Sequence, residues 1–259
     1  MPKSAKLGQN FLHDRNIAAK IIDAFLPQAG PVLEIGPGPG ILSALLLEKV
    51  PAERVTLVEL DRFLAGKLKE RFGDPPRVIQ EDILKVDLAR LYPQDRVAII
   101  GNLPYHISKE LIDWLIAQRE TIGEAVLMLQ RDFVDKLLSR ENNKKYNAQS
   151  VVFQLLFQAR RCFHVAAGAF VPQPKVVSTV IAARPLEPPL PDVGEFYGFV
   201  RQCFAERRKT LWNNLATRLD KKALAALAAA SGLPATARAE QLPPDVFPGL
   251  FVAATGDAR

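Results

Sequence analysis

The sequence predicts an α/β protein in which helices cover both faces of a parallel sheet and a smaller helical domain follows. Three observations support this fold class. Before residue 184, short apolar runs typical of buried strands alternate with segments of helical apolar spacing. A proline-dense segment, residues 184–191, then interrupts the alternation. Beyond it the patterns are helical only, so we place the domain boundary near residue 188.

The expected elements follow in chain order. A helix begins near Asp14, because Ile17, Ile21, Ile22 and Phe25 recur at close to helical spacing. Strands are expected at residues 32–35, 55–59, 78–80, 97–101 and 125–129, and helices between them at residues 41–48, 62–72 and 108–118. Two β-like runs, residues 162–166 and 176–183, are expected to form a closing antiparallel pair. C-terminal helices are expected at residues 195–205, 209–217 and 221–231, the last of them ended by Gly232.

Composition restricts the class of protein. A chain of 259 residues with 48% hydrophobic content can bury a full core, and it fits one large and one small domain. No apolar run approaches the roughly 18 residues of a membrane span, and the N-terminus has no apolar signal core. Two cysteines without metal-like spacing suit a reducing compartment, so we expect a cytoplasmic protein without a metal site.

The basic residues are clustered rather than spread evenly. A net charge of +6 and a pI near 9.4 suggest an anionic partner. Any one cluster can be an ordinary solvated face, but several clusters beside a candidate base pocket favour nucleic acid. The clusters are Lys3 and Lys6 before the first helix, Arg140, Lys144 and Lys145 in a polar loop, and Arg207-Arg208-Lys209 inside a C-terminal helical pattern.

The segment Asn102-Leu103-Pro104-Tyr105 leaves the carboxyl end of a predicted strand, where open α/β sheets bind their ligands. The side-chain oxygen of Asn102 can accept one N–H of an exocyclic amine. The carbonyl of Leu103, held extended by Pro104, can accept the other. Tyr105 supplies a ring on which a base can stack. The segment therefore predicts a pocket for a flipped adenine.

A glycine-rich loop, Glu34-Ile35-Gly36-Pro37-Gly38-Pro39-Gly40, joins the first sheet strand to a helix and lets a ligand approach the backbone. Ile41 stands where a dinucleotide fingerprint carries a small residue, and no Lys-Ser/Thr pair follows, so phosphate ligands are disfavoured. Glu59 ends the second strand and can bind ribose hydroxyls, and Asp82 follows the third and can accept from adenine. Acids at three successive strand ends, Glu34, Glu59 and Asp82, together with this loop suit S-adenosylmethionine, a cationic sulfonium without phosphates.

Taken together, these residues resemble the small-subunit ribosomal RNA adenine dimethyltransferase family, and the resemblance covers nearly the whole chain. The glycine-rich loop is shared by many methyltransferases, whereas the combination of GQNFL, NLPY, PQPKV and RRKT is specific. His106 and Asn147 depart from the family pattern, at positions that commonly carry Asn and Gly. The segments that carry the resemblance are residues 8–12, 34–40, 58–61, 80–82, 101–105, 169–178, 204–215 and 238–240.

The resemblance implies a Rossmann-like class I S-adenosylmethionine-dependent methyltransferase domain at residues 1–188 and a helical RNA-binding domain at residues 189–259. It implies dimethylation of the N6 amino groups of two adjacent adenosines in a loop near the 3′ end of small-subunit rRNA, during biogenesis of that subunit. The partners implied are small-subunit rRNA and the pre-30S particle, with no membrane partner and a monomeric enzyme.

The resemblance also implies roles for individual residues, with Gly36 near the methionine part and Phe170 on the base face opposite Tyr105. The expected catalytic residues are Asn102, Leu103, Pro104, Tyr105 and Phe170. The expected cofactor-binding residues are Gln9, Asn10, Leu12, Gly36, Gly38, Glu59, Leu60, Asp82, Ile83 and Asn102. The expected RNA-binding residues are Lys3, Lys6, Lys144, Lys145, Arg207, Arg208 and Lys209.

Two alternatives stay open. A large-subunit rRNA or other N6-adenine methyltransferase would share the cofactor loop and the aromatic residues. A mainly non-catalytic small-subunit assembly factor could keep the same fold. The segment at residues 204–215 and the helical tail favour the small-subunit interpretation, and intact Asn102, Tyr105, Glu59 and Asp82 favour catalysis.

Overall fold

The computed structural model of the chain describes residues 10–25, 30–187, 190 and 192–256. The chain forms two compact units, one made of Met1–Val134 with Gln158–Pro185 and one of Asp135–Phe157 with Leu186–Arg259. The structure thus groups residues 135–157 with the C-terminal helices, whereas the sequence placed them in the first domain. The functional division at residue 188 stays a prediction.

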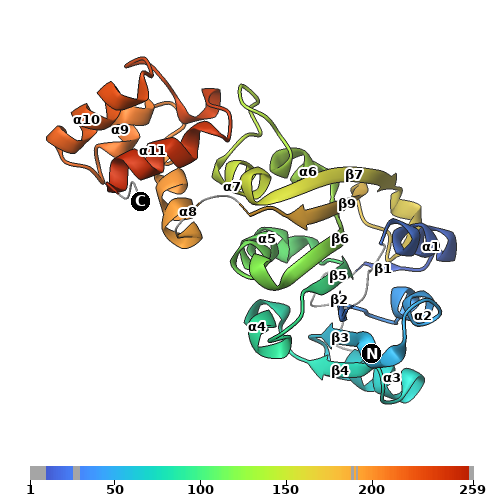
Figure 1. The fold of residues 1–259 in the computed structure, drawn as a ribbon. Coiled ribbons are helices and arrows are strands. Elements are labelled where there is room, and N and C mark those ends of the chain that lie inside the picture. Colours follow the sequence, from blue (N-terminus) through green and yellow to red (C-terminus); the bar gives the residue numbers. More distant parts are fainter. Residues whose placement is uncertain (1–9, 26–29, 188–189, 191, 257–259) are drawn as a thin grey trace. The chain divides into compact units, whose positions relative to one another are not determined.

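A seven-stranded sheet forms the centre of the first unit, in the order β4-β3-β2-β5-β6-β9-β7 (Figure 1). Strands β2 to β6 are joined by parallel pairings, and β9 pairs antiparallel with β6. This confirms the predicted α/β fold and its mostly parallel sheet. The strands are β2 (Val32–Ile35), β3 (Val55–Glu59), β4 (Arg77–Gln80), β5 (Val97–Asn102), β6 (Ile122–Gln130), β7 (Phe157–Val165) and β9 (Ser178–Pro185).

The position of β2 determines where a ligand can bind. It has β3 on one side and β5 on the other, so the chain order reverses at this strand. Such a switch point leaves a crevice at the carboxyl ends of the strands, because the connections leave in opposite directions. The glycine-rich loop follows β2, and Asn102 ends β5. The topology therefore brings two predicted motifs to one edge of the sheet.

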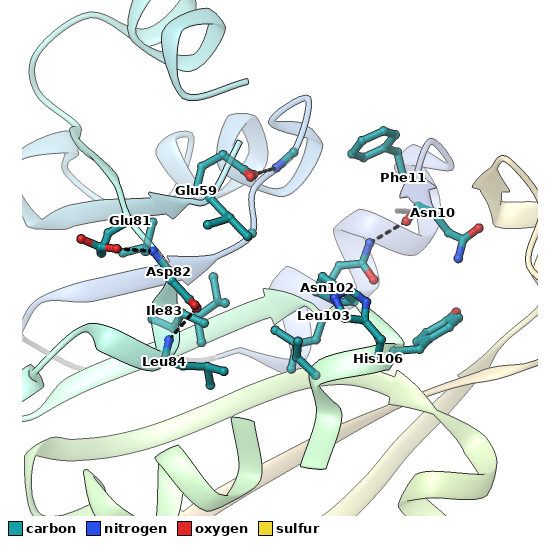
Figure 2. Close-up of a pocket in the computed structure, with 18 residues that line it drawn as sticks. Asn10, Phe11, Glu59, Glu81, Asp82, Ile83, Leu84, Asn102, Leu103 and His106 are labelled. Atoms are coloured by element: carbon teal, nitrogen blue, oxygen red, sulfur yellow. Dashed lines mark hydrogen bonds between the residues drawn. The ribbon is translucent and has the colours of Figure 1, made fainter. Parts of the chain in front are cut away.

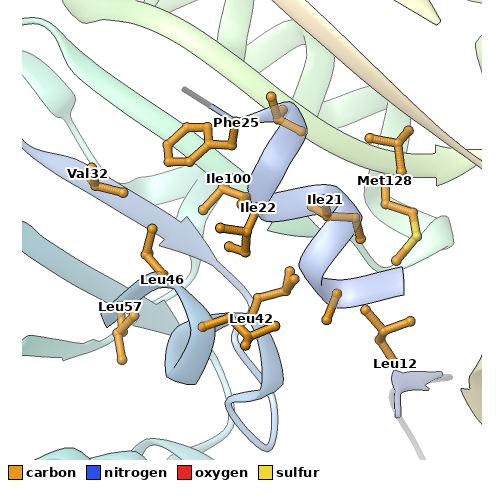
Figure 3. Close-up of a cluster of buried hydrophobic side chains, with 14 of the residues drawn as sticks. Leu12, Ile21, Ile22, Phe25, Val32, Leu42, Leu46, Leu57, Ile100 and Met128 are labelled. Carbon is orange, nitrogen blue, oxygen red and sulfur yellow. The ribbon is translucent and has the colours of Figure 1, made fainter. Parts of the chain in front are cut away.

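Helices cover both faces of the sheet (Figure 1). On one face, α1 and α2 bury Ile21, Ile22 and Leu46 against the strands, and this cluster fixes the start of α2 beside β2 (Figure 3). Burying each such side chain stabilises the fold by roughly 1.5–3 kcal/mol. The helices of this unit include α1 (Arg15–Ala24), α2 (Ile41–Leu47), α3 (Arg62–Phe72), α4 (Leu88–Leu91) and α5 (Ser108–Ala117).

Local sequence explains most of these boundaries. The carboxylate of Asp14 accepts the backbone N–H groups of Asn16 and Ile17 at 2.8 and 3.2 Å, which confirms the predicted start of α1. The predicted strand and helix positions in this unit are confirmed, with β6 and β7 longer than expected. A short two-stranded sheet of β1 (Phe11–Leu12) and β8 (Phe170–Val171) was not predicted. Among the described residues, none of the helices combines the length and apolar character that a membrane span requires.

The second unit is helical and contains an aromatic core. Phe196 and Phe199 pack around Phe251, with ring centroids 5.6 Å apart in both pairs. Gly232 ends α10 in the left-handed conformation, as predicted. The helices are α7 (Ala148–Leu156), α8 (Val193–Cys203), α9 (Leu211–Leu215), α10 (Lys221–Ser231) and α11 (Val246–Thr255), with α6 (Arg131–Leu137) leading into the unit.

One expectation for this region was wrong, and two helices were not predicted. Arg207, Arg208 and Lys209 do not lie in a helix: they occupy a turn between α8 and α9, because Thr210 caps α9 and starts it afresh. Helix α7 was not predicted, although its apolar residues recur at helical spacing, namely Ala148, Val151, Val152, Leu155 and Leu156. Helix α11 was missed because its second and third positions after Val246 include a proline and a glycine.

Candidate active site

A cavity of about 270 Å³ opens at the carboxyl ends of β2, β3, β4 and β5 (Figure 2). This volume is near the lower end of the roughly 300–1,000 Å³ that small-molecule sites occupy. Among its described lining residues three are acidic, namely Glu59, Glu81 and Asp82, and none is lysine or arginine. Such a lining favours a cationic ligand over a phosphorylated one, as the sequence predicted.

The glycine-rich loop forms one wall of the cavity. Gly36 and Gly38 have φ angles of +62° and +57°, a left-handed backbone conformation that residues other than glycine rarely adopt. The Gly36 N–H donates to the Val58 carbonyl at 2.9 Å, which ties the loop to β3. A Cβ atom at Gly38 would lie 3.0 Å from the ring of Phe11. The loop therefore packs directly beneath Phe11, a cavity residue for which the sequence supplied no individual role.

Glu59 is held in place by two backbone donors. Its Oε2 accepts the Gly38 N–H at 3.0 Å (Figure 2). Its Oε1 accepts the Asp61 N–H at 2.9 Å. The residue is 2% exposed, and this burial raises the pKa of Glu59 although both backbone N–H groups oppose the rise. Each oxygen keeps a further lone pair. The carboxylate can thus accept two neighbouring hydroxyl groups, which is the geometry of a ribose.

Asp82 has a structural role as well as a place at the cavity. Its Oδ1 accepts the Leu84 N–H at 3.1 Å and caps the 3₁₀ helix Ile83–Lys85. The neighbouring Glu81 accepts the Asp82 N–H at 2.8 Å (Figure 2). These bonds fix the turn that follows β4. The second Asp82 oxygen remains able to accept a hydrogen bond from a ligand.

Glu34 behaves differently from the other two predicted acids. It lies outside the cavity lining and is 1% exposed. Burial raises the pKa of Glu34 to about 8, and the nearby Glu59 adds to the rise. Within the described part of the chain, its Oε2 has no hydrogen-bond partner. At neutral pH this group is mainly uncharged, so it adds little negative charge to the site.

Asn102 ends β5 and lines the cavity, at the edge of the sheet where the sequence predicted an acceptor for an adenine amino group. Its Nδ2 donates to the Asn10 carbonyl across 3.4 Å, a long hydrogen bond that links β5 to the N-terminal segment (Figure 2). Because the amide nitrogen is used in this way, the side-chain oxygen is the atom available to accept an amine hydrogen. The Leu103 N–H donates to the Met128 carbonyl at 3.2 Å, which fixes the backbone of the second predicted acceptor.

Tyr105 is half-buried, and its hydroxyl is paired. The phenol oxygen lies 2.7 Å from Oγ of Ser178, the fully buried first residue of β9. Burial raises the pKa of Tyr105 above its ordinary value, so the phenol stays protonated. The contact links the loop after β5 to a strand 73 residues away. The sequence placed Ser178 at the end of the family segment 169–178 but predicted no individual role for it.

Two predicted site residues do not reach the cavity. Phe170 is 2% exposed and Leu12 is 4% exposed, and both belong to the hydrophobic cluster beneath α1 and α2. They face each other in the β1–β8 pairing. Stacking of a base on Phe170 would require this short strand to move, and this role stays a prediction. Gln9 lies outside the described residues, and the other expected cofactor-binding residues line the cavity.

The predicted RNA-binding residues of the second unit have different surroundings. Lys145 pairs with Asp135 at 3.1 Å, and Lys209 pairs with Glu206 at 2.6 Å. Arg207 is engaged by Glu240 and by backbone carbonyls. Lys144 and Arg208 are exposed, and the structure gives them no ion pair with another described residue. Lys3 and Lys6 lie outside the described residues.

The second departure from the family pattern has a structural explanation. Asn147 has an extended backbone, with φ −156° and ψ 177°, and its side chain caps α7 by accepting from Gln149 and Ser150. The hydroxyl of Ser150 accepts the Asn147 N–H in return, which completes a capping box. No left-handed residue is needed at this position.

Comparison with known proteins gives consistent results. The family model for ribosomal RNA adenine dimethylase matches residues 2–252. Ribosomal RNA small subunit methyltransferase A of Acidobacterium capsulatum is 38% identical over 256 residues, which cover 95% of this chain and 89% of that protein. The protein of the same name in Geobacter metallireducens is also 38% identical, over 94% of this chain and 92% of its own length.

Solved structures extend the comparison. The 23S rRNA methyltransferase ErmE is 27% identical with a TM-score of 0.68, and the match covers 95% of this chain and all of that one (100%). A dimethyladenosine transferase from Plasmodium falciparum has a TM-score of 0.75 at 24% identity, over 93% of this chain and 95% of its own. The second likeness shows the shared fold.

Proposed function

The chain belongs to the ribosomal RNA adenine dimethylase family, and on that premise we propose that it dimethylates the N6 amino groups of two adjacent adenosines in a loop near the 3′ end of small-subunit rRNA. The methyl donor of the family is S-adenosylmethionine. The observation that carries the proposal is the orientation of Asn102. Its amide nitrogen is tied to Asn10, so its oxygen is left for a substrate amine beside the acid-lined cavity.

The cavity suits the cofactor on chemical grounds. When bound, S-adenosylmethionine supplies an electrophilic methyl group on a sulfonium. Glu59 would hold the ribose through the free lone pairs of both carboxylate oxygens. Asp82 would accept from the adenine amino group, and the Gly36 backbone, which lines the cavity, would lie against the methionine part. Because the described lining contains no lysine or arginine, none of these side chains would repel the positively charged sulfonium.

Asn102 and the Leu103 carbonyl would activate the substrate amine. An adenine amino nitrogen is a poor nucleophile, because its lone pair is delocalised into the ring. Accepting both N–H groups favours a pyramidal nitrogen whose lone pair points at the methyl group. Positive charge develops on this nitrogen during transfer, and preorganised acceptors stabilise it. Holding the two reacting atoms in line at near-contact distance supplies the remaining acceleration.

Tyr105 would stabilise the adenine after it leaves its stack in the RNA. Flipping a base requires a few kcal/mol, and less when the base lies in a loop. Stacking on an aromatic ring returns roughly 1–3 kcal/mol. The bond to Ser178 restricts the ring of Tyr105, so little further ordering is needed when the base arrives.

We place the reaction in the cytoplasm on a pre-30S particle, with the enzyme acting as a monomer. The family relatives named for the small subunit support the choice of substrate at 36–39% identity, compared with 27% for the 23S rRNA methyltransferase. The basic surface of the second unit supports binding to an RNA-rich particle.

One experiment tests the substrate directly. The enzyme is incubated with small-subunit particles, large-subunit particles and a labelled methyl donor, and the RNA is then digested to nucleosides. We expect labelled N6,N6-dimethyladenosine from the small subunit alone. Label in large-subunit RNA would overturn the substrate assignment, and donor binding without any label would favour a non-catalytic assembly role.

A further inference from the structure

Arg207 uses its side chain to hold the chain's own backbone. Its Nη1 donates to the Lys144 carbonyl at 2.6 Å, and its Nη2 donates to the Asn143 carbonyl at 3.1 Å. Its Nε lies 2.6 Å from Oε2 of Glu240. All four residues belong to the second unit. Every nitrogen of the guanidinium is therefore engaged within the protein.

Glu240 holds the same loop a second time. Its backbone carbonyl accepts the N–H of Asn142 at 2.7 Å. Asn142 has a φ angle of +62°, so the loop passes through a left-handed turn at the point where Glu240 binds it. The loop ends on a further anchor, because the Tyr146 hydroxyl donates to the Leu242 carbonyl at 3.0 Å. Residues 142–146 are thus fixed by one arginine and by the segment around Glu240.

The basic residues around this clamp differ from Arg207. Arg140, Lys144 and Arg208 are exposed, and none of them forms an ion pair within the described part of the chain. The clamp holds the backbone of Lys144 against Arg207, which is the chain neighbour of Arg208. A phosphate ligand needs its donors pointing into solvent, and these three residues meet that condition better than Arg207 does.

We propose that Arg207 and Glu240 are positioning residues that hold residues 142–146 so that Arg140, Lys144 and Arg208 contact the RNA phosphate backbone. Arg140 is linked to this segment because the Asn143 N–H donates to its carbonyl at 3.3 Å. The proposal rests on the proposed function, since it presupposes small-subunit RNA as the substrate. In this proposal Arg207 acts on RNA binding indirectly, by positioning its neighbours, whereas the sequence predicted that Arg207 contacts RNA itself. It also gives Glu240 a role in RNA binding despite its negative charge.

The charge of Glu240 makes the proposal sharply testable. If only electrostatics mattered, Glu240→Gln would strengthen RNA binding, because it removes a negative charge from a basic surface. If Glu240 positions the loop, the same substitution weakens binding. Glu206→Gln is the matched control: it also removes one negative charge next to Arg207, but from the turn between α8 and α9, where the Glu206 carboxylate pairs with Lys209 rather than with Arg207.

We expect Glu240→Gln and Arg207→Lys each to raise the KM for small-subunit RNA about tenfold, with kcat and the Kd of S-adenosylmethionine unchanged. The double variant should be no weaker than the weaker single variant, because both changes release one loop. Glu206→Gln should bind RNA as tightly as the wild type or more tightly. Arg208→Ala should lower the salt slope of RNA binding by about one charge.

Two results separate failure of this inference from failure of the proposed function. If the wild type neither binds nor methylates small-subunit RNA, the proposed function is wrong. If the wild type does both, and Glu240→Gln binds RNA as well as Glu206→Gln does, the positioning role alone is wrong. Should Glu240→Gln unfold, Glu240→Asp decides: it keeps the charge and shortens the reach, so wild-type binding in that variant would overturn the proposal.

Discussion

Removing the hydroxyl of Ser178 isolates what its contact with Tyr105 contributes to catalysis. The two oxygens are 2.7 Å apart, Ser178 is fully buried, and Tyr105 is half-buried at the cavity. A neutral hydrogen bond of this kind contributes about 0.5–1.5 kcal/mol, which corresponds to roughly a 2- to 13-fold change in rate. We therefore expect Ser178→Ala to lower kcat/KM for RNA by a factor in that range.

Steady-state kinetics on small-subunit RNA measure the effect, with donor binding by calorimetry as the control. Tyr105→Phe removes the same bond from its other end and should give a loss of similar size. Because both variants lose one shared contact, the double variant should be no slower than the slower single variant. Losses that multiply in the double variant, or an unchanged kcat/KM in Ser178→Ala, would refute a positioning role for the contact.

Three further predictions concern the cavity and its surroundings. Asn102→Ala should lower kcat roughly 100- to 1,000-fold while the variant still binds S-adenosylmethionine in calorimetry, and wild-type turnover would remove Asn102 from the mechanism. Glu59→Gln should weaken donor binding about tenfold or more in the same assay, because the amide turns an N–H group toward one of the two backbone donors. The raised pKa of Glu34, about 8, predicts stability that is full below pH 4.5 and falls as the pH rises through 8. Glu34→Gln should flatten this dependence in thermal unfolding between pH 5 and 9, and an unchanged slope would contradict the assignment.

The sheet could be predicted from sequence because its strands are buried on both faces. Runs such as Val97 to Ile100 are apolar throughout, and every residue of β2 and β3 is buried. A continuous apolar run of this length is a clear indication of a buried strand. The first site motifs were predicted for a related reason. Parallel strands place their carboxyl ends at one edge, so Glu59, Asp82 and Asn102 had to meet there.

Contacts between distant segments could not be predicted in this way. The family resemblance implied that Phe170 stacks on the target base, yet pairing with β1 buries this ring in the core. The sequence predicted that Arg207, one of three adjacent cations, binds RNA. In the structure its guanidinium instead donates to backbone carbonyls of a loop more than 60 residues away. Neither partner leaves a local signal in the sequence, because each contact depends on tertiary packing.

The register of β2 against β5 explains how one edge of the sheet can serve both methyl donor and acceptor. Ile35 pairs with Gly101, and a Cβ atom at the next residue, Gly36, would lie 3.8 Å from the Asn102 carbonyl oxygen, so Gly36 and Asn102 are neighbours. The pairing is close because Gly101 has no side chain: a Cβ atom there would lie 2.9 Å from the Ile35 carbonyl oxygen. In the proposed mechanism, a donor bound at Gly36 would therefore lie beside an amine held by Asn102. A slip of one residue would separate them by about 3.3 Å, which is enough to abolish in-line contact between the reacting atoms.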